Sequence, residues 1–136
     1  TNKNDDLLVL FESDGFNRIS VDLIWKRYLN LGLKKFSIQD KLAGRGEYVM
    51  KSYFHFDSKI KLKEEQKNKY SLELNDKAAS FFIDLQGEFH INAYYGDDSP
   101  LGWQCLAYGK RVPAYTLEII KKVNLPEIMN YSLIWA

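Results

Sequence analysis

Apolar and polar positions alternate with a period of two along almost the whole chain. This period indicates β-strands with one buried face, because successive side chains of a strand point to opposite faces of the sheet. The pattern predicts about ten short strands and little helix. The apolar runs that carry it lie at residues 7–11, 25–31, 36–42, 48–56, 60–63, 70–74, 80–85, 89–95, 103–108, 115–122 and 131–135.

Polar and turn-forming residues separate these runs at short intervals. They cluster at residues 14–15, 44–46, 66–69, 75–77, 86–87 and 96–100. Short strands joined by hairpin-length connections favour an all-β fold, an antiparallel β-sandwich, over alternating β-α-β units. No linker, internal repeat or low-complexity tract interrupts the pattern, so we expect residues 1–136 to form a single domain.

Composition excludes several classes of protein. With 136 residues and 46% apolar residues, the chain is not disordered by composition. The 19 basic and 18 acidic residues nearly cancel, so no broad positive field is available to bind nucleic acid. No apolar run reaches the roughly 20 residues of a membrane helix, so we expect no membrane insertion. The single cysteine, Cys105, excludes an internal disulfide and a multi-cysteine zinc site.

The two histidines do not form an evident catalytic or metal site. His55 and His90 lie within apolar strands, in Phe-His-Phe and Phe-His-Ile contexts, which favours hydrogen-bonded or surface strand histidines. The Asp97-Asp98-Ser99 cluster has oxygen ligands but lacks the spacing of a calcium loop, which favours an ordinary turn. We therefore expect no catalytic residue, no metal ligand and no cofactor in this chain.

Basic side chains recur on one face of a predicted strand, at Lys59, Lys61 and Lys63. Such a stripe could contact an acidic polysaccharide. Protection of an exposed strand edge is the favoured interpretation, because lysines are common on edge strands and Glu64 and Glu65 follow directly.

The segment from Gly102 to Pro113 holds the most unusual residues of the chain. Its aromatic rings could stack on sugar rings and its cations could hold carboxylates. A strand that bends at Gly109 and Pro113 explains the same residues without a ligand. The candidate substrate-binding residues are Trp103, Tyr108, Lys110 and Arg111.

Four segments, in order, resemble the last part of the heparinase II/III-like family of polysaccharide lyases. The matching family patterns are Asp-Gly-Tyr-x-Arg, an apolar-x-Ile-x-Asp-x-Leu-x-Gly-x-Gly hairpin, Phe-His-Phe, and Gly-Trp-x-Ser-x-x-Tyr-Gly-x-x-x-Pro. The corresponding residues here are 14–18, 36–46, 54–56 and 102–113. Ser13 replaces the family's preceding His, and Gln104-Cys105 departs from the last pattern.

The resemblance implies a role within a larger protein. Members of this family join an N-terminal α-helical toroid to C-terminal antiparallel β-sandwich layers, and they cleave uronate-containing acidic polysaccharides by β-elimination. Their catalytic and metal-binding stretches, Gly-His-x-His-like and His-Asn-Thr-like, do not occur in this sequence. The chain also opens with a polar segment that lacks Met, as an excised piece would.

We therefore expect the non-catalytic C-terminal β-sandwich domain of a bacterial enzyme, inactive alone. Its expected partners are the missing N-terminal catalytic domain and acidic polysaccharide. Typical members are periplasmic or secreted. An excised domain should also expose one contiguous apolar face.

Two other interpretations remain open. A self-standing carbohydrate-binding module would use the segment around Trp103 and Arg111. A protein-binding or immunity-type domain is the third, since small globular chains without catalytic signatures often bind proteins.

Overall fold

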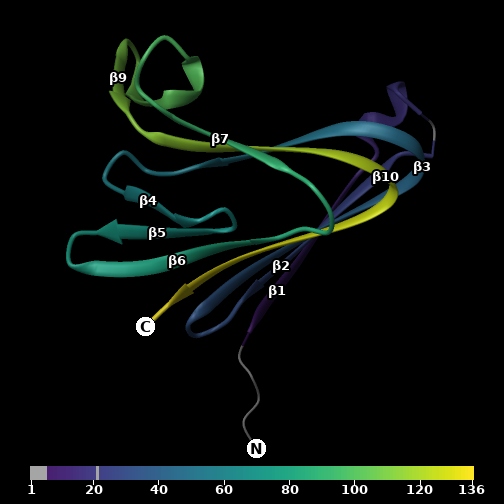
Figure 1. Cartoon of the computed structure of the whole chain (residues 1–136), viewed down its shortest axis with the longest axis horizontal. Helices are drawn as coiled ribbons and strands as arrows, with labels where there is room; N and C mark the ends of the chain where they lie inside the picture. Colours follow the sequence, from purple (N-terminus) through teal and green to yellow (C-terminus); the bar gives the residue numbers. More distant parts are fainter. Residues whose placement is uncertain (1–5, 21) are drawn as a thin grey trace, which may run out of the picture.

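The computed structural model describes residues 6–20 and 22–136, so the polar opening at residues 1–5 lies outside the described part. The described chain is built almost entirely from strands, with a 3-10 turn at Gly15–Arg18 (η1) and another at Pro100–Gly102 (η2) (Figure 1). The strands are β1 (Leu7–Ser13), β2 (Ile24–Leu31), β3 (Lys35–His55), β4 (Lys61–Gln66), β5 (Lys69–Leu74), β6 (Lys77–Asp84), β7 (His90–Tyr95), β8 (Trp103–Ala107), β9 (Lys110–Pro113) and β10 (Tyr115–Trp135).

Two long strands, β3 and β10, organise the fold. Each has 21 residues, and they pair antiparallel from Thr116 opposite His55 to Ile134 opposite Lys35. The pairing register shifts between Leu125 and Glu127, where the residues opposite on β3 include Gly44 and Gly46. Both glycines have positive φ, 138° and 98°, which other residues rarely adopt. The β3–β10 pair therefore continues through this irregularity, and its two halves belong to two different layers of the fold.

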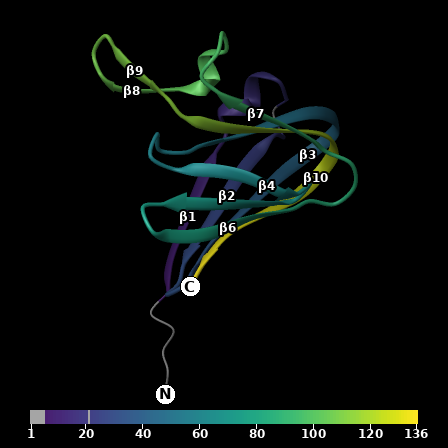
Figure 2. The same cartoon turned by 60° about the vertical axis from the view of Figure 1, so that its left-hand side comes forward.

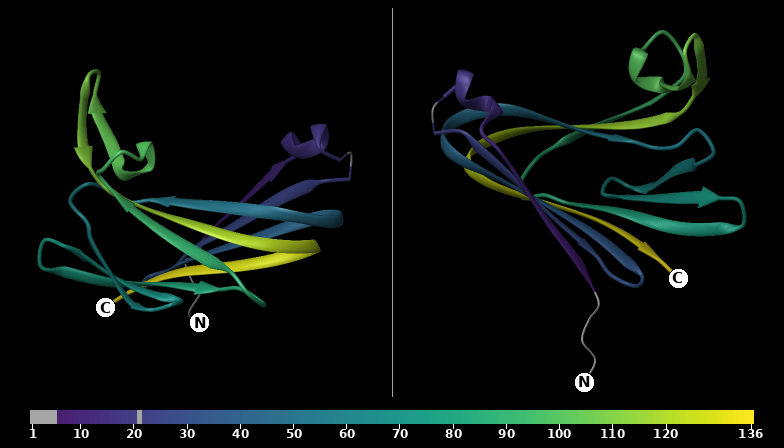
Figure 3. Two further views of the ribbon diagram at one scale, coloured as in Figure 1. Left: turned by 45° about the horizontal axis from the view of Figure 1, so that its top comes forward. Right: turned by 180° about the vertical axis from the view of Figure 1, so that it is seen from behind.

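The two layers share the β3–β10 pair (Figure 3). The long layer has the strand order β1-β2-β3-β10-β6-β5-β4 and uses residues 35–42 of β3 and 127–135 of β10. The short layer consists of β7, residues 115–125 of β10 and residues 46–55 of β3. The β8–β9 hairpin is a separate two-stranded sheet that stands away from both layers (Figure 2).

The core lies between the two layers. Leu117 of the short layer is 0% exposed and Tyr131 of the long layer is 2% exposed. The ring of Phe54 packs against Tyr131 and Phe81, with centroid distances of 4.7 Å and 5.0 Å. Burial of these aliphatic and aromatic side chains is the main stabilising contribution. Burial also raises the pKa of Tyr131 to about 12, because the ionised phenol would lose its hydration.

An ion pair between a buried carboxylate and a partly exposed guanidinium joins β2 to β3. Asp40 is 1% exposed and accepts hydrogen bonds from Arg27 Nε at 2.7 Å and Arg27 Nη2 at 2.8 Å. The indole of Trp25 donates to the same carboxylate at 3.1 Å. The hydrogen bond with Asp40 raises the pKa of Arg27 above its ordinary value. This bidentate contact fixes the β2–β3 register, since a shift by one residue would leave the carboxylate unpaired.

The predicted fold class is confirmed: the described residues form an antiparallel, sandwich-like all-β fold without an α-helix. Individual strands differ from the expectation. The runs at 36–42 and 48–56 belong to one strand, β3, and those at 115–122 and 131–135 belong to β10. The glycines of residues 44–46 form a bend where the sequence pattern predicted a turn. No helix of the described residues is long and apolar enough to cross a membrane.

Candidate functional site

The β8–β9 hairpin carries the four residues that the sequence singled out. The Arg111 guanidinium carbon lies 4.1 Å from the centroid of the Trp103 ring, a cation–π contact across the hairpin. Trp103 Nε1 donates to the carbonyl oxygen of Asp97 at 3.0 Å, which fixes the indole against the preceding loop. The structure thus brings Trp103 and Arg111 together.

The other two candidates lie at the hairpin turn. Tyr108 is fully exposed, with a relative accessibility of 106%, and the Lys110 side chain is also exposed. Gly109, between them, has a φ of 72°, which forms the tight turn. Tyr108 and Lys110 are therefore presented to solvent.

A hollow of about 280 Å³ separates the hairpin from the ends of β3 and β10. Trp103 lines one side of it, and His55 and Thr116 line the other. Gln104 bridges the two parts: its side-chain oxygen accepts from the Ser58 amide at 2.8 Å. Asp57 accepts hydrogen bonds from the backbone amide of Lys59 and from the Gln104 side chain. Both bonds lower the pKa of the Asp57 carboxyl, the Lys59 bond more than the Gln104 bond.

The outer face of the short layer carries a polar cluster centred on Glu118, which the sequence patterns did not reveal. Glu118 is 6% exposed, and its Oε1 accepts from Asn92 Nδ2 at 3.0 Å and from the Tyr94 hydroxyl at 3.1 Å. Tyr53 is the residue directly opposite Glu118 on β3. One row of this face therefore runs Asn92–Glu118–Tyr53 across three strands.

The donors around Glu118 keep it ionised. The Asn92 hydrogen bond is the largest cause that lowers its pKa below the ordinary 4.5, and Tyr53, Tyr94 and Lys51 act in the same direction against partial burial. The carboxylate in turn raises the pKa of both phenols. A carboxylate held this way is a hydrogen-bond anchor for the three strands and a weak proton acceptor.

Both histidines border this cluster. His55 Nδ1 lies 2.9 Å from the Thr116 hydroxyl, and His90 Nε2 lies 3.0 Å from the Asn92 side-chain oxygen. They occupy rows on either side of the Glu118 row. Within residues 6–20 and 22–136, no three His, Cys, Asp or Glu side chains converge as metal ligands would.

No family model and no curated protein matches the sequence, whereas solved structures match the fold. The chain superposes on heparan sulfate lyase HepC from Pedobacter heparinus with a TM-score of 0.70 at 14% identity. It superposes on the lysine-methylated heparinase III product of BT4657 with a TM-score of 0.75 at 12% identity, and on heparinase III with 0.72 at 16%. This chain has a heparinase III-like fold. It is covered to 98–99% in these superpositions but spans only 20% of each solved chain.

One edge of the heparinase III-like sheet exposes a large apolar surface. Among the described residues, strand β1 pairs only with β2, and apolar side chains on both of its faces are more than half exposed. They are Leu7 at 58%, Leu8 at 70%, Leu10 at 54% and Phe11 at 51%.

The adjoining 3-10 turn and the segment after it add Phe16 and Ile19, which line a mostly apolar hollow of about 150 Å³ with Val49. We call β1 together with Phe16 and Ile19 the apolar edge. A surface of this kind on a soluble domain is typical of a contact with another protein segment.

Proposed function

We propose that this chain is a non-catalytic C-terminal domain of a larger heparinase II/III-like polysaccharide lyase. The parent enzyme would cleave a uronate-containing acidic polysaccharide by β-elimination. The single observation that carries the proposal is the extent of the fold match: nearly the whole chain aligns, and it spans only 20% of each solved lyase chain. Residues 1–136 would form one domain that packs against the α-helical toroid and supports it.

The apolar edge supports this proposal. A β1 strand with exposed leucines on both faces is an unprotected sheet edge, which natural proteins usually cover or charge. The other four-fifths of a lyase-sized chain supplies the covering segment. The partner we propose for the apolar edge is therefore the rest of the same polypeptide.

The polar clusters support the non-catalytic part of the proposal. β-Elimination needs a base that removes the proton next to a uronate carboxylate and an acid that protonates the leaving oxygen. Glu118 is the most buried carboxylate of the short layer, but its hydrogen-bond donors lower its pKa and make it a weak base. The two histidines lie on different strands and in different rows of the sheet, with the Glu118 row between them.

An elimination assay tests this function directly. The purified chain is incubated with heparan sulfate, chondroitin sulfate and alginate, and the absorbance of the unsaturated uronate product is followed. An active heparinase III sample is the positive control. We expect no product above the buffer rate. Robust turnover by the chain alone would contradict the non-catalytic proposal.

A second candidate function, a self-standing carbohydrate-binding module, is favoured by the hollow beside Trp103. An indole fixed by Asp97 and covered on one side by Arg111 is a rigid ring near a cation. This function predicts heat of binding with uronate oligosaccharides that disappears in Trp103→Ala, while circular dichroism shows an intact fold. Calorimetry without heat across acidic glycans would reject it.

A further inference from the structure

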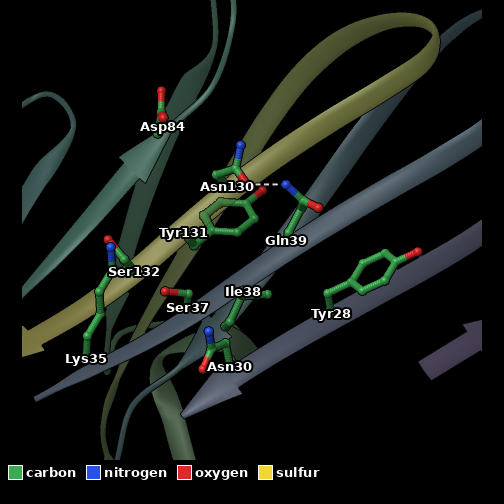
Figure 4. Close-up of a pocket in the computed structure, with 10 residues that line it drawn as sticks. All are labelled: Tyr28, Asn30, Lys35, Ser37, Ile38, Gln39, Asp84, Asn130, Tyr131 and Ser132. Carbon is green, nitrogen blue, oxygen red and sulfur yellow. Dashed lines mark hydrogen bonds between the residues drawn. The ribbon is translucent and has the colours of Figure 1, made fainter. Parts of the chain in front are cut away.

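A groove crosses the outer face of the long layer, on the side of the sheet away from the core (Figure 4). Its volume is about 380 Å³, within the range of about 300–1,000 Å³ that small-ligand sites occupy. Four strands contribute to it: β2, β3, β10 and β6. It shares no lining residue with the hollow beside Trp103.

Its first row of side chains runs straight across the four strands. Tyr28 lies opposite Gln39, Gln39 opposite Asn130, and Asn130 opposite Asp84. Gln39 Nε2 donates to Asn130 Oδ1 at 3.0 Å, as Figure 4 shows. This bond orients both amides and leaves the Gln39 carbonyl oxygen and the Asn130 amino group for another partner.

The second row lies two residues further along each strand, on the same face. Asn30 lies opposite Ser37, and Ser37 opposite Ser132. Asn30 Oδ1 is buried and has no hydrogen-bond partner among residues 6–20 and 22–136. A buried acceptor without a partner is rare in folded proteins, so Asn30 is an unusual residue at this side of the groove.

The two rows together combine amides and hydroxyls, with an aromatic ring at one end. Amide and hydroxyl groups both donate and accept, which suits the vicinal hydroxyls of a sugar. The Tyr28 ring provides an apolar surface on which a sugar ring can stack. The groove thus has the chemistry of a saccharide site.

Two lysines lie at or beside the groove. Lys35 lines it, and the Lys41 ammonium nitrogen lies 5.0 Å from the centroid of the Tyr28 ring. Asp84, at the β6 end, is the one carboxylate among the lining residues. Lys41 therefore makes the Tyr28 end positive, and Lys35 lies further along β3, six residues from Lys41. Both positions favour a sugar that carries a carboxylate or sulfate group.

We propose that this groove binds a short segment of an acidic glycan, with one sugar ring on Tyr28 and its acidic group near Lys41, a further acidic group of the segment near Lys35, and hydroxyls on the two polar rows. The site holds glycan without cleaving it. It deepens the proposed function by giving the domain its own contact with polysaccharide, and the class of glycan rests on that function.

The test is a titration of the isotope-labelled chain, followed by backbone amide NMR. The probes are heparan sulfate and alginate oligosaccharides of defined length, with neutral cello-oligosaccharides for comparison. We expect the largest shifts at Tyr28, Asn30, Gln39 and Asn130. The double variant Lys35→Gln/Lys41→Gln should bind at least tenfold more weakly, since it removes two charges from exposed or half-exposed positions without disturbing the core.

Two further variants separate this groove from the hairpin. Tyr28→Ala should weaken binding similarly, whereas Trp103→Ala should leave the affinity within about twofold. Binding that survives the lysine variant and is lost in Trp103→Ala would overturn the proposal, as would the absence of groove shifts with every acidic glycan. Equal affinity for neutral glycans would overturn the assignment of an acidic glycan as the ligand. Turnover in the elimination assay would contradict the proposed function while leaving groove binding intact, so the two failures are distinguishable.

Discussion

The two edge strands of the long layer, β1 and β4, expose opposite kinds of surface. β1 has the sequence Leu-Leu-Val-Leu-Phe-Glu-Ser, and apolar side chains on both of its faces are exposed. β4 has the sequence Lys-Leu-Lys-Glu-Glu-Gln, and only Leu62 is partly buried. In the part of the chain that the structure describes, each strand has a single neighbour in the sheet, β2 for one and β5 for the other.

The difference shows which edge carries the protection that a free strand edge usually has. Unpaired strand edges bind other strands, and charged side chains prevent this. β4 is protected by Lys61, Lys63 and Glu64, whereas β1 has no charge before Glu12. Under the proposed function, β4 faces solvent and β1 is covered by the rest of the polypeptide.

The largest effect is expected from breaking the ion pair that anchors the β1 side of the sheet. Asp40→Ala leaves the Arg27 guanidinium and the Trp25 indole without their acceptor. Because Arg27 is partly exposed, we expect a loss of about 3 kcal/mol, the lower end for a buried pair. Thermal unfolding should show a Tm lower by roughly 10 °C. Asp84→Ala, which alters an exposed carboxylate, is the matched control, and an equal loss in both variants would contradict the anchoring role.

The next effect concerns self-association of the isolated chain through the apolar edge. Leu8 and Leu10 lie on one face of β1, so Leu8→Lys/Leu10→Lys should make that face cationic and weaken association at least tenfold in Kd. Burial of one leucine contributes about 1.5–3 kcal/mol, and 1.4 kcal/mol corresponds to a factor of ten. Sedimentation velocity measures the change. Leu106→Lys, on the distant β8 strand, should have no effect; unchanged association in the β1 variant would locate the contact elsewhere.

The opposite substitution at β4, from charged to apolar, should increase self-association, and the effect should be smaller. Lys61→Leu/Lys63→Leu removes the charges that protect this edge, so we expect slow aggregation at concentrations where the original chain is stable. Light scattering over time reports it. Lys122→Leu, an exposed position on the interior strand β10, should remain soluble, and a soluble β4 variant would show that these lysines have no protective role.

The smallest expected effect is a pH dependence of folding stability that involves neither β1 nor β4. A carboxyl whose pKa is lowered by folding stabilises the folded state above its unfolded pKa, and this contribution is lost as the pH falls. Glu118 should therefore contribute at pH 7 and lose its contribution below its ordinary value of 4.5. Glu118→Gln should flatten the fall in Tm between pH 7 and pH 3, with Asp57 responsible for part of the remaining slope. Glu73→Gln is the exposed control, and an unchanged slope in Glu118→Gln would reject the assignment.

The sequence predicted local features well and distant pairings poorly. Alternation located the strands and the charged edge at Lys61 and Lys63, because both depend on neighbouring residues only. The continuity of β3 could not be predicted, since Gly44 and Gly46 are equally suited to a turn and to a bend with positive φ. Only the pairing with β10 distinguishes the two.

The candidate sites show the same difference between contacts that are local in the sequence and contacts that join distant strands. Trp103 and Arg111 lie on the two strands of one hairpin, so their contact was accessible from the sequence segment itself. The cluster around Glu118 combines three strands that are distant in sequence, with Asn92 26 residues away. The alternating polar residues of β7 and the Thr-x-Glu of β10 were the available signal, but they do not specify partners.

The most direct test of the account is the mass of the native product. An antibody raised against this chain is used to blot a lysate of the source cells. We predict a band several times heavier than 15.9 kDa, because the domain spans only 20% of each solved lyase chain with its fold. A single band near 15.9 kDa would contradict the account, since the apolar edge would then have no covering segment within its own polypeptide.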